Sequence, residues 1–144
     1  MLIQAVETNG GRVSYKQNTD GSQSPYELNI TYVDAILGDR SSIQAEKFLA
    51  SQSIQYALPG VPATYIHSLL GSRNWLEGVK QTGRARSINR QKLRAEAVIA
   101  SLADAQSFRA RVFYPYLHMI RTRRRQPAFH PNADFEVLNF HPKI

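Results

Sequence analysis

Helical spacing of apolar positions marks two long stretches of this chain. Residues 42–58 predict a helix, and Ser41 together with Gln44 fits a capping box at its start. The apolar residues that share one face of this helix, and that we expect to form its buried side, are Ala50, Ile54, Ala57 and Leu58.

The second long helix is predicted after Asp104, which would act as its N-cap, and Pro127 is expected to end it. Pro115 lies inside this helix. Because proline has no N–H to donate toward the carbonyl of Arg111, we expect a kink there. The apolar stripe of the helix has near-helical spacing and is formed by Phe108, Val112, Tyr116, Met119 and Ile120.

A short apolar run, Val61–Ile66, lies between the two helices. It follows Pro59–Gly60 and ends abruptly in His67 and Ser68, before a loop rich in Gly, Arg and Asn. A strand that is apolar on both sides is typical of a buried parallel sheet, and α/β barrels build their active sites at the carboxyl ends of such strands. The order of helix, strand and polar loop predicts one repeat of a barrel.

The rest of the chain predicts shorter elements. Turn residues at Gly10–Gly11, Asp20–Gly21 and Pro25 indicate turns, rather than long elements, over residues 9–29. Further elements are expected at 2–8 (the tail of a helix, with more sequence expected upstream of it), 28–32 (a strand), 75–79 (a helical turn), 91–102 (a helix) and 135–138 (the start of a strand).

Composition narrows the class of protein. With 144 residues, 42% of them hydrophobic, the chain is large enough for one ordinary core. It has no apolar run near the ~20 residues that a membrane span needs, and its first residues do not resemble a secretory signal. The absence of cysteine excludes disulfides and thiolate metal sites. We expect a cytoplasmic protein with no cofactor, no bound metal and no membrane partner.

The net charge of +7 is unevenly distributed along the chain. Arginines gather densely at positions 121, 123, 124 and 125 and more loosely at 84, 86, 90 and 94. Such clusters can bind an anionic partner, although no aromatic residues are interleaved as in nucleic-acid modules, which makes nucleic acid an unfavoured partner. The alternative for the dense cluster is the C-terminal turn of a helix, where cations interact favourably with the helix dipole.

Three residues stand out as candidates for a polar site. His67 would lie at the carboxyl end of the predicted strand, and Glu27 lies among aromatic and amide neighbours in the loop SPYELN. Arg86 lies in GRARSINR, where its guanidinium could clamp a carboxylate or a phosphate. The ordinary alternatives are a satisfied core histidine and a solvated arginine. Glycoside chemistry needs two facing carboxylates, and the sequence offers no convincing pair.

Four blocks of sequence, in order, resemble one known family. They are PYELNITYVDAILGD, FLASQSIQYALPGVPATYIHSLLGSRN, TGRARSINR and HMIRTRRRQPAFHPNA, and the match runs from about Gly10 to Asn132. The chain resembles the C-terminal part of the sucrose phosphorylase-like enzymes of glycoside hydrolase family 13, and SPYELN and YIHSLLGSRN look closest to the glucosylglycerate phosphorylase branch.

The resemblance implies a retaining glucosyl-transfer enzyme on a (β/α)₈ barrel. Such enzymes form a covalent glucosyl intermediate and release it to phosphate as α-glucose 1-phosphate. Their catalytic carboxylates lie upstream of the matched part, so no residue of this chain is expected to be catalytic. Arg86 matches an arginine of the glucose subsite, Tyr26 and Glu27 match the mobile acceptor loop, and His67 matches the end of strand 8. Pro115 departs from the family pattern.

The resemblance also divides the chain into three parts. Residues 1–40 would end an inserted acceptor-loop region, 41–128 would form the last helix–strand–helix repeats of the barrel, and 129–144 would begin a C-terminal β-domain. The implied substrates are phosphate and sucrose or a glucosylglycerate-type glucoside. We expect a mostly helical fragment that is inactive alone and that either self-associates or needs a complementary N-terminal fragment. The alternative is a non-enzymatic remnant that binds an anionic partner through its arginines.

Overall fold

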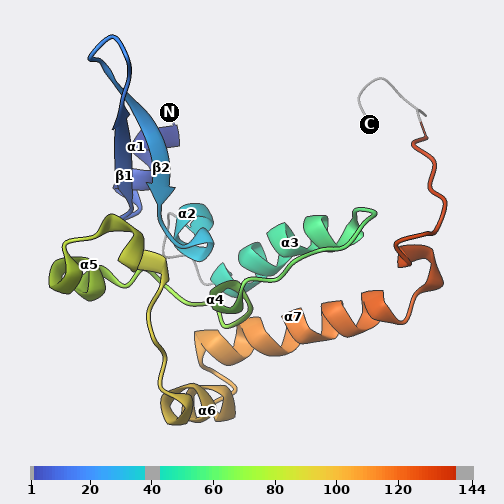
Figure 1. Ribbon diagram of the computed structural model, residues 1–144. Coiled ribbons are helices and arrows are strands. Elements are labelled where there is room, and N and C mark those ends of the chain that lie inside the picture. The colour runs from blue at the N-terminus through green and yellow to red at the C-terminus, as the bar shows by residue number, and fades with distance from the viewer. Residues whose placement is uncertain (1, 38–42, 139–144) are drawn as a thin grey trace.

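The computed structural model describes residues 2–37 and 43–138, and this part of the chain is mostly helical, as predicted (Figure 1). Its elements, in order, are α1 (Leu2–Thr8), β1 (Arg12–Gln17), β2 (Gln23–Asn29), α2 (Tyr32–Leu37), α3 (Gln44–Ala57), α4 (Ile66–Leu69), α5 (Leu76–Thr82), the 3₁₀ turn η1 (Ala85–Asn89), α6 (Ala95–Ala103), α7 (Phe108–Arg124) and the 3₁₀ turn η2 (Pro127–Phe129).

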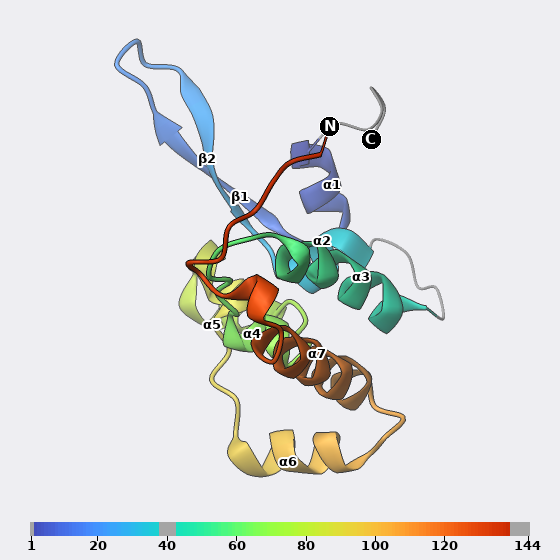
Figure 2. The same ribbon diagram turned by 90° about the vertical axis from the view of Figure 1, so that its right-hand side faces the viewer.

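Helices α3 and α7 lie side by side and run in the same direction (Figures 1 and 2). The main core forms where they meet α2, and its buried members are Val33, Ala45, Phe48, Tyr56, Val112 and Tyr116. The predicted stripe of α7 is confirmed, because Val112 and Tyr116 are fully buried and the other three stripe residues pack partly buried against the same core.

The predicted buried face of α3 is wrong. Ile54 is 65% exposed and Leu58, just past the helix, is 58% exposed. The buried side is instead formed by Ala45, Phe48, Gln52 and Tyr56. Gln52 belongs to it because its Oε1 accepts a hydrogen bond from the buried hydroxyl of Tyr116 at 2.8 Å, and a pattern that counts only apolar residues misses such a position. Burial also raises the pKa of Tyr116.

The helix caps differ from the predicted ones. Helix α7 is capped by Ser107, whose Oγ accepts from the N–H of Ala110 at 3.0 Å, whereas Asp104 accepts from the N–H of Gln106 in the preceding turn. Helix α3 begins after Ile43, which makes no side-chain cap bond, and the predicted cap Ser41 lies outside the described residues. Pro115 is accommodated within one continuous helix.

Three of the shorter predicted elements are found in the structure. Helix α1 is confirmed, and it ends at Thr8, two residues before Gly10, whose φ of 77° suits the turn that follows a helix. The helical turn expected at 75–79 is α5, and the helix expected at 91–102 is α6, which begins four residues later than predicted.

Residues 61–65 do not form the predicted strand. They have no regular secondary structure, Val61 is 80% exposed, and Ile66 already begins α4. A parallel strand exists only where neighbouring strands complete its ladder, and the sheet of the described residues is the β1–β2 pair. The run instead lies along α3, where Gln55 Nε2 donates to the Ala63 carbonyl at 2.9 Å.

Residues 135–138 also lack the predicted strand. Phe135 is 70% exposed and Val137 is 74% exposed, so this end of the described chain packs little apolar surface. An unpaired apolar run of this kind has no ladder partner within the described residues, which is the physical reason that no strand forms.

The strand expected at 28–32 is wrong, because β2 ends at Asn29 and Tyr32 begins α2. The β1–β2 hairpin was not predicted, and its tip projects away from the helices (Figure 2). Its tip is the predicted turn, with Gly21 at φ 82° and the carboxylate of Asp20 accepting from the N–H of Ser22 at 2.9 Å. The hydroxyl of Ser22 also donates to this carboxylate, and the hydrogen bonds from that hydroxyl and from the N–H lower the pKa of Asp20. The flanking strands were missed because most of their side chains are exposed and therefore show no alternation of apolar and polar residues.

The buried side chain of Arg123 closes the C-terminal ends of α3 and α7. Its Nη1 donates to the carbonyls of Tyr56 (2.6 Å) and Leu58 (2.9 Å), and its Nη2 donates to that of Gly60 (2.7 Å). The guanidinium also lies 4.3 Å from the ring centroid of Phe129. The helix C-terminus expected for the dense arginine cluster is therefore confirmed, and Arg123 caps carbonyls that α3 leaves unpaired.

Replacing Arg123 by alanine should strongly destabilise the chain. Removal of the guanidinium leaves buried carbonyls without their charged donor, which we expect to lower the free energy of unfolding by about 2 to 4 kcal/mol. Urea denaturation followed by circular dichroism measures this loss. The matched control is Arg121→Ala, in the exposed part of the same cluster, which should change stability by less than about 0.5 kcal/mol. Equal effects of the two substitutions would contradict this role.

Gly71 brings the loop after α4 close to α7. Its φ is +58°, and a Cβ added there would lie 3.2 Å from the Phe108 ring and from Val112. Gly83, which ends α5, has a similar φ of +66° but open space around it. Both glycines adopt a left-handed backbone, but only Gly71 is closely packed, so comparing substitutions at the two positions separates the cost of backbone strain from that of overpacking.

Alanine should be tolerated worse at position 71 than at position 83. Gly83→Ala carries only the cost of a left-handed alanine, roughly 1 kcal/mol. Gly71→Ala adds overpacking against α7, which typically costs about 1–3 kcal/mol more. Thermal unfolding of the two variants side by side tests the difference. A Gly71→Ala variant as stable as Gly83→Ala would show that α7 gives way without cost.

Candidate functional site

Glu27 and Arg86 form an ion pair between two elements that are 59 residues apart in sequence. Arg86 Nη2 lies 3.0 Å from Glu27 Oε2, which joins strand β2 to the 3₁₀ turn η1. The Glu27 side chain is 33% exposed and that of Arg86 is 51% exposed. An ion pair this open to solvent contributes little stability, so its importance is that it places a guanidinium beside the hairpin.

Tyr26 lies at an irregularity of the hairpin. Glu27 pairs with Ser14, but Pro25 pairs with Tyr15, so Tyr26 is an extra residue between two successive pairs. This is a β-bulge, a device that redirects side chains, and Pro25 fits beside it because proline cannot donate a ladder hydrogen bond. Tyr26 is 66% exposed, so the hairpin presents it at the open surface one residue before Glu27.

His67 lies in α4 rather than at the end of a strand. Its Nδ1 is 3.0 Å from the hydroxyl oxygen of Ser72, and its ring centroid is 5.2 Å from that of Tyr65. Partial burial, with a smaller contribution from the charge of Arg109, lowers the pKa of His67. The neutral imidazole is therefore the favoured form near pH 7.

A small cavity of about 160 Å³ adjoins His67. Ser72 and Asn89 line it as well, and Asn89 is the last residue of η1, the turn that carries Arg86. The hydroxyl of Tyr65 donates to the Asn89 carbonyl at 2.8 Å. The neighbourhood of His67 is thus joined through Asn89 to the turn that bears Arg86.

Sequence reasoning missed Asp34, which is the most heavily bonded carboxylate near this site. Its Oδ2 accepts from the hydroxyl of Thr31 (3.0 Å) and from the N–H of Asn74 (2.5 Å), and its Oδ1 lies 2.5 Å from Nε of Arg73. The signal was present, because Thr31 and Asp34 have the spacing of a capping box at the start of α2.

The described carboxylates nearest the core each have an arginine partner. Arg73 faces Asp34, Arg86 faces Glu27, and Arg111 Nη2 lies 2.9 Å from Glu46 Oε1. The hydrogen bonds to Glu46 lower the pKa of that carboxyl group. Within the described ranges no cluster of three histidine or carboxylate side chains is arranged to hold a metal ion. These carboxylates therefore act as anchors for arginines.

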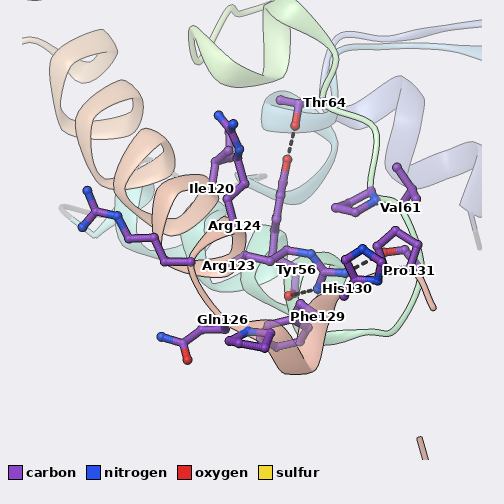
Figure 3. A pocket seen from close by; sticks show the side chains of 14 residues that line it. Tyr56, Val61, Thr64, Ile120, Arg123, Arg124, Gln126, Phe129, His130 and Pro131 are labelled. Carbon is purple, nitrogen blue, oxygen red and sulfur yellow. Dashed lines mark hydrogen bonds between the residues drawn. The ribbon is translucent and has the colours of Figure 1, made fainter. Parts of the chain in front are cut away.

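A larger cavity, of about 480 Å³, lies away from the candidate residues (Figure 3). It opens between residues 60–64 and the C-terminal end of α7, with apolar walls that include Val61, Ile120 and Phe129. Arg123 lines it, but its guanidinium already bonds three carbonyls. The arginine cluster is thus partly structural, which weakens the alternative of an anion-binding module. Of the helices described, none combines the length and apolarity that crossing a bilayer requires.

The lowered pKa of His67 predicts a pH-dependent stability. Folding favours neutral His67, so its contribution is fully present above the unfolded-state pKa of about 6.5. It is lost as the pH falls from there through the folded-state pKa. NMR titration should find the His67 ring protonating at lower pH in the folded chain than in urea, and His67→Gln should flatten this part of the stability profile. Protonation at or above the unfolded-state value would refute the burial argument.

Comparison with known proteins identifies several relatives, although no family model matches the chain. A glucosylglycerate phosphorylase of Spirochaeta thermophila is 50% identical over 140 residues, which are 95% of this chain and 24% of that protein. A glucosylglycerate phosphorylase of Escherichia coli is 38% identical over 138 residues (94% and 25%). A sucrose phosphorylase of Agrobacterium vitis is 34% identical over 112 residues (78% and 20%).

A solved structure supports the same relationship. The crystal structure of sucrose 6F-phosphate phosphorylase from Thermoanaerobacter thermosaccharolyticum matches 89% of this chain and 25% of its own, with a TM-score of 0.71 and 27% identity. This match confirms the predicted fold class, a C-terminal part of a (β/α)₈ barrel enzyme. The chain spans about a quarter of the length of the relatives it matches. It therefore belongs to the sucrose phosphorylase-like enzymes of glycoside hydrolase family 13.

Proposed function

We propose that this chain supplies one side of the substrate site of a retaining α-glucoside phosphorylase. The complete enzyme would transfer a glucosyl group to phosphate and release α-glucose 1-phosphate. The observation that carries the proposal is the Glu27–Arg86 pair, which holds a half-exposed guanidinium beside the bulge at Tyr26. The sequence relationship to phosphorylases over nearly the whole chain supports it.

Each candidate residue has a role that its chemistry allows. Arg86 bonds Glu27 through Nη2, and because half of its side chain is exposed, its other N–H donors can reach sugar hydroxyls. Tyr26 is exposed, and its phenol would contact phosphate or the acceptor. Neutral His67 would donate or accept one hydrogen bond in the neighbouring cavity without adding charge.

The substrate we favour is a glucosylglycerate-type glucoside. Three glucosylglycerate phosphorylases are 50%, 38% and 40% identical to the chain, whereas the sucrose phosphorylases of Agrobacterium vitis and Streptococcus mutans are 34% and 30% identical. Sucrose is the runner-up. The difference in identity supports the glucosylglycerate branch of the family.

The chain alone should not catalyse the reaction. Retaining transfer needs a carboxylate nucleophile and a second carboxyl group as acid/base, about 5–5.5 Å apart. Asp34, Glu27 and Glu46 each face an arginine instead. Residues 61, 63 and 65 are exposed, so we propose that a complementary N-terminal fragment or a second copy covers this run.

Two activity measurements test this function. The pure chain, incubated with glucosylglycerate or sucrose plus phosphate, should release no glucose 1-phosphate above a blank without protein. A chimera should be active: the Spirochaeta thermophila enzyme with its matching 140 residues replaced by those of this chain should phosphorolyse glucosylglycerate. Turnover by the isolated chain would overturn the first expectation.

Within the chimera, Arg86→Lys provides the sharper test. Lysine keeps the charge but loses the planar fork, so kcat/KM should fall by roughly 10- to 100-fold. Arg90→Lys, in the same loop, is the matched control and should leave kcat/KM within about twofold. A folded but inactive parent chimera, or an Arg86→Lys chimera as active as its parent, would count against the proposed function.

A further inference from the structure

Four consecutive residues, 72–75, connect the elements that carry the candidate site. The side chain of Ser72 meets His67, and that of Arg73 meets Asp34 in α2. The backbone N–H of Trp75 donates to the carbonyl of Ile88 in η1 at 2.8 Å. The segment thus reaches α4, α2 and η1 in turn, and the remaining member, Asn74, reaches the hairpin.

The side-chain amide of Asn74 bonds the backbone at both ends of the β1–β2 hairpin. Its Nδ2 donates to the carbonyl of Asn9, just before β1, at 3.1 Å. Its Oδ1 accepts from the N–H of Thr31, just after β2, at 2.8 Å. The two partners lie 65 and 43 residues away in sequence. Because donor and acceptor are both used, the amide fixes the direction in which the hairpin leaves the body.

The backbone of Asn74 is itself anchored. Its N–H donates to the carboxylate of Asp34 at 2.5 Å, and Asp34 is 9% exposed. The next residue, Trp75, is bonded to η1. The hairpin that carries Glu27 and the turn that carries Arg86 therefore take their positions from two adjacent residues.

The Glu27–Arg86 ion pair is too exposed to set this geometry unaided. Exposed pairs are weak because water screens the charges and the side chains lose freedom. The bonds of Asn74 are partly buried and run between backbone and amide groups, so they are less screened. We therefore infer that the bonds of Asn74 hold the hairpin in place, and that the Glu27–Arg86 ion pair forms as a result of that placement.

We propose that Asn74 is a positioning residue that holds the β1–β2 hairpin, and with it Glu27 and Tyr26, against the η1 turn that carries Arg86. This inference rests on the proposed function for its catalytic consequence. Its structural part stands on the hydrogen bonds of the chain itself.

Spin labels can test the structural part in the chain as it is. The sequence has no cysteine, so cysteines introduced at the exposed positions Lys16 in β1 and Lys80 in α5 can be labelled cleanly. Pulsed electron paramagnetic resonance should give a narrow distance distribution that becomes at least twice as broad in Asn74→Ala. The matched control is Asn132→Ala, at an exposed asparagine after η2, which should leave the width unchanged.

A second variant keeps the test valid if Asn74→Ala fails to fold. Asn74→Asp retains the acceptor for the N–H of Thr31 but loses the donor to the Asn9 carbonyl, so its distribution should be intermediate. Circular dichroism establishes that each variant is folded. A folded Asn74 variant whose distribution is as narrow as that of the unmodified chain would overturn the proposal.

The catalytic part is measured in the active chimera. Asn74→Ala should raise KM for phosphate more than tenfold while kcat changes less than threefold, because the displaced hairpin carries Tyr26, the residue assigned to phosphate or the acceptor. If Asn74 acts through the hairpin, its effect should be smaller in a Glu27→Gln background. The positioning role would be contradicted if the effects of Asn74→Ala and Glu27→Gln were fully additive. It would also be contradicted if Asn74→Ala lowered kcat and raised KM for the glucoside by equal factors. The activity of the parent chimera reports on the proposed function separately.

Discussion

The parallel packing of α7 along α3 is the contact on which the rest of this structure depends. Arg123 closes it at one end by bonding the carbonyls of Tyr56 in the last turn of α3 and of Leu58 just after it, and the buried bond of Tyr116 to Gln52 closes it in the middle. The ring of Tyr116 also lies 6.2 Å from that of Phe48 and 5.7 Å from that of Tyr56. Apolar contact thus supplies the attraction, and polar groups that must be satisfied on burial fix the register.

This helix pair carries the loop that builds the site. After α3 the chain is held at Gly60 by Arg123, and after α4 Gly71 lets the backbone approach α7 closely. Arg109 of α7 adds a bond from Nη1 to the carbonyl of Leu70 at 3.1 Å. These contacts hold residues 72–75 against α7. The hairpin and η1 are positioned in turn by their bonds to residues 72–75.

The sequence predicted the elements whose signal is local or strongly periodic. The stripe of α7 and the turn at Asp20–Gly21 are of this kind, and both are found as expected. The buried side of α3 could not be predicted from apolar spacing, because Gln52 is buried for its hydrogen bond rather than for its hydrophobicity. The strands of the hairpin were hidden for a related reason, since exposed strands need no alternating pattern.

Prediction of the candidate site met the same limit. The resemblance singled out Tyr26, Glu27, His67 and Arg86 one position at a time, but it carried no information about what holds them together. Asn74 is an ordinary polar loop residue in the sequence, and its role is visible only when its two distant backbone partners are known. Hydrogen bonds from a side chain to a distant backbone group produce no periodic pattern in the sequence.

Residues 61–65 and the polar network illustrate two ways in which a chain specifies structure. The apolar run is expected to form a strand only when neighbouring strands supply the ladder hydrogen bonds and packed elements cover its two faces. The network around Asn74 and Asp34 closes within the described residues and needs no such partner. The geometry of one side of the site can therefore be set before the barrel is complete. In the complete enzyme that we propose, the rest of the barrel would meet a hairpin and an arginine whose relative placement this network sets.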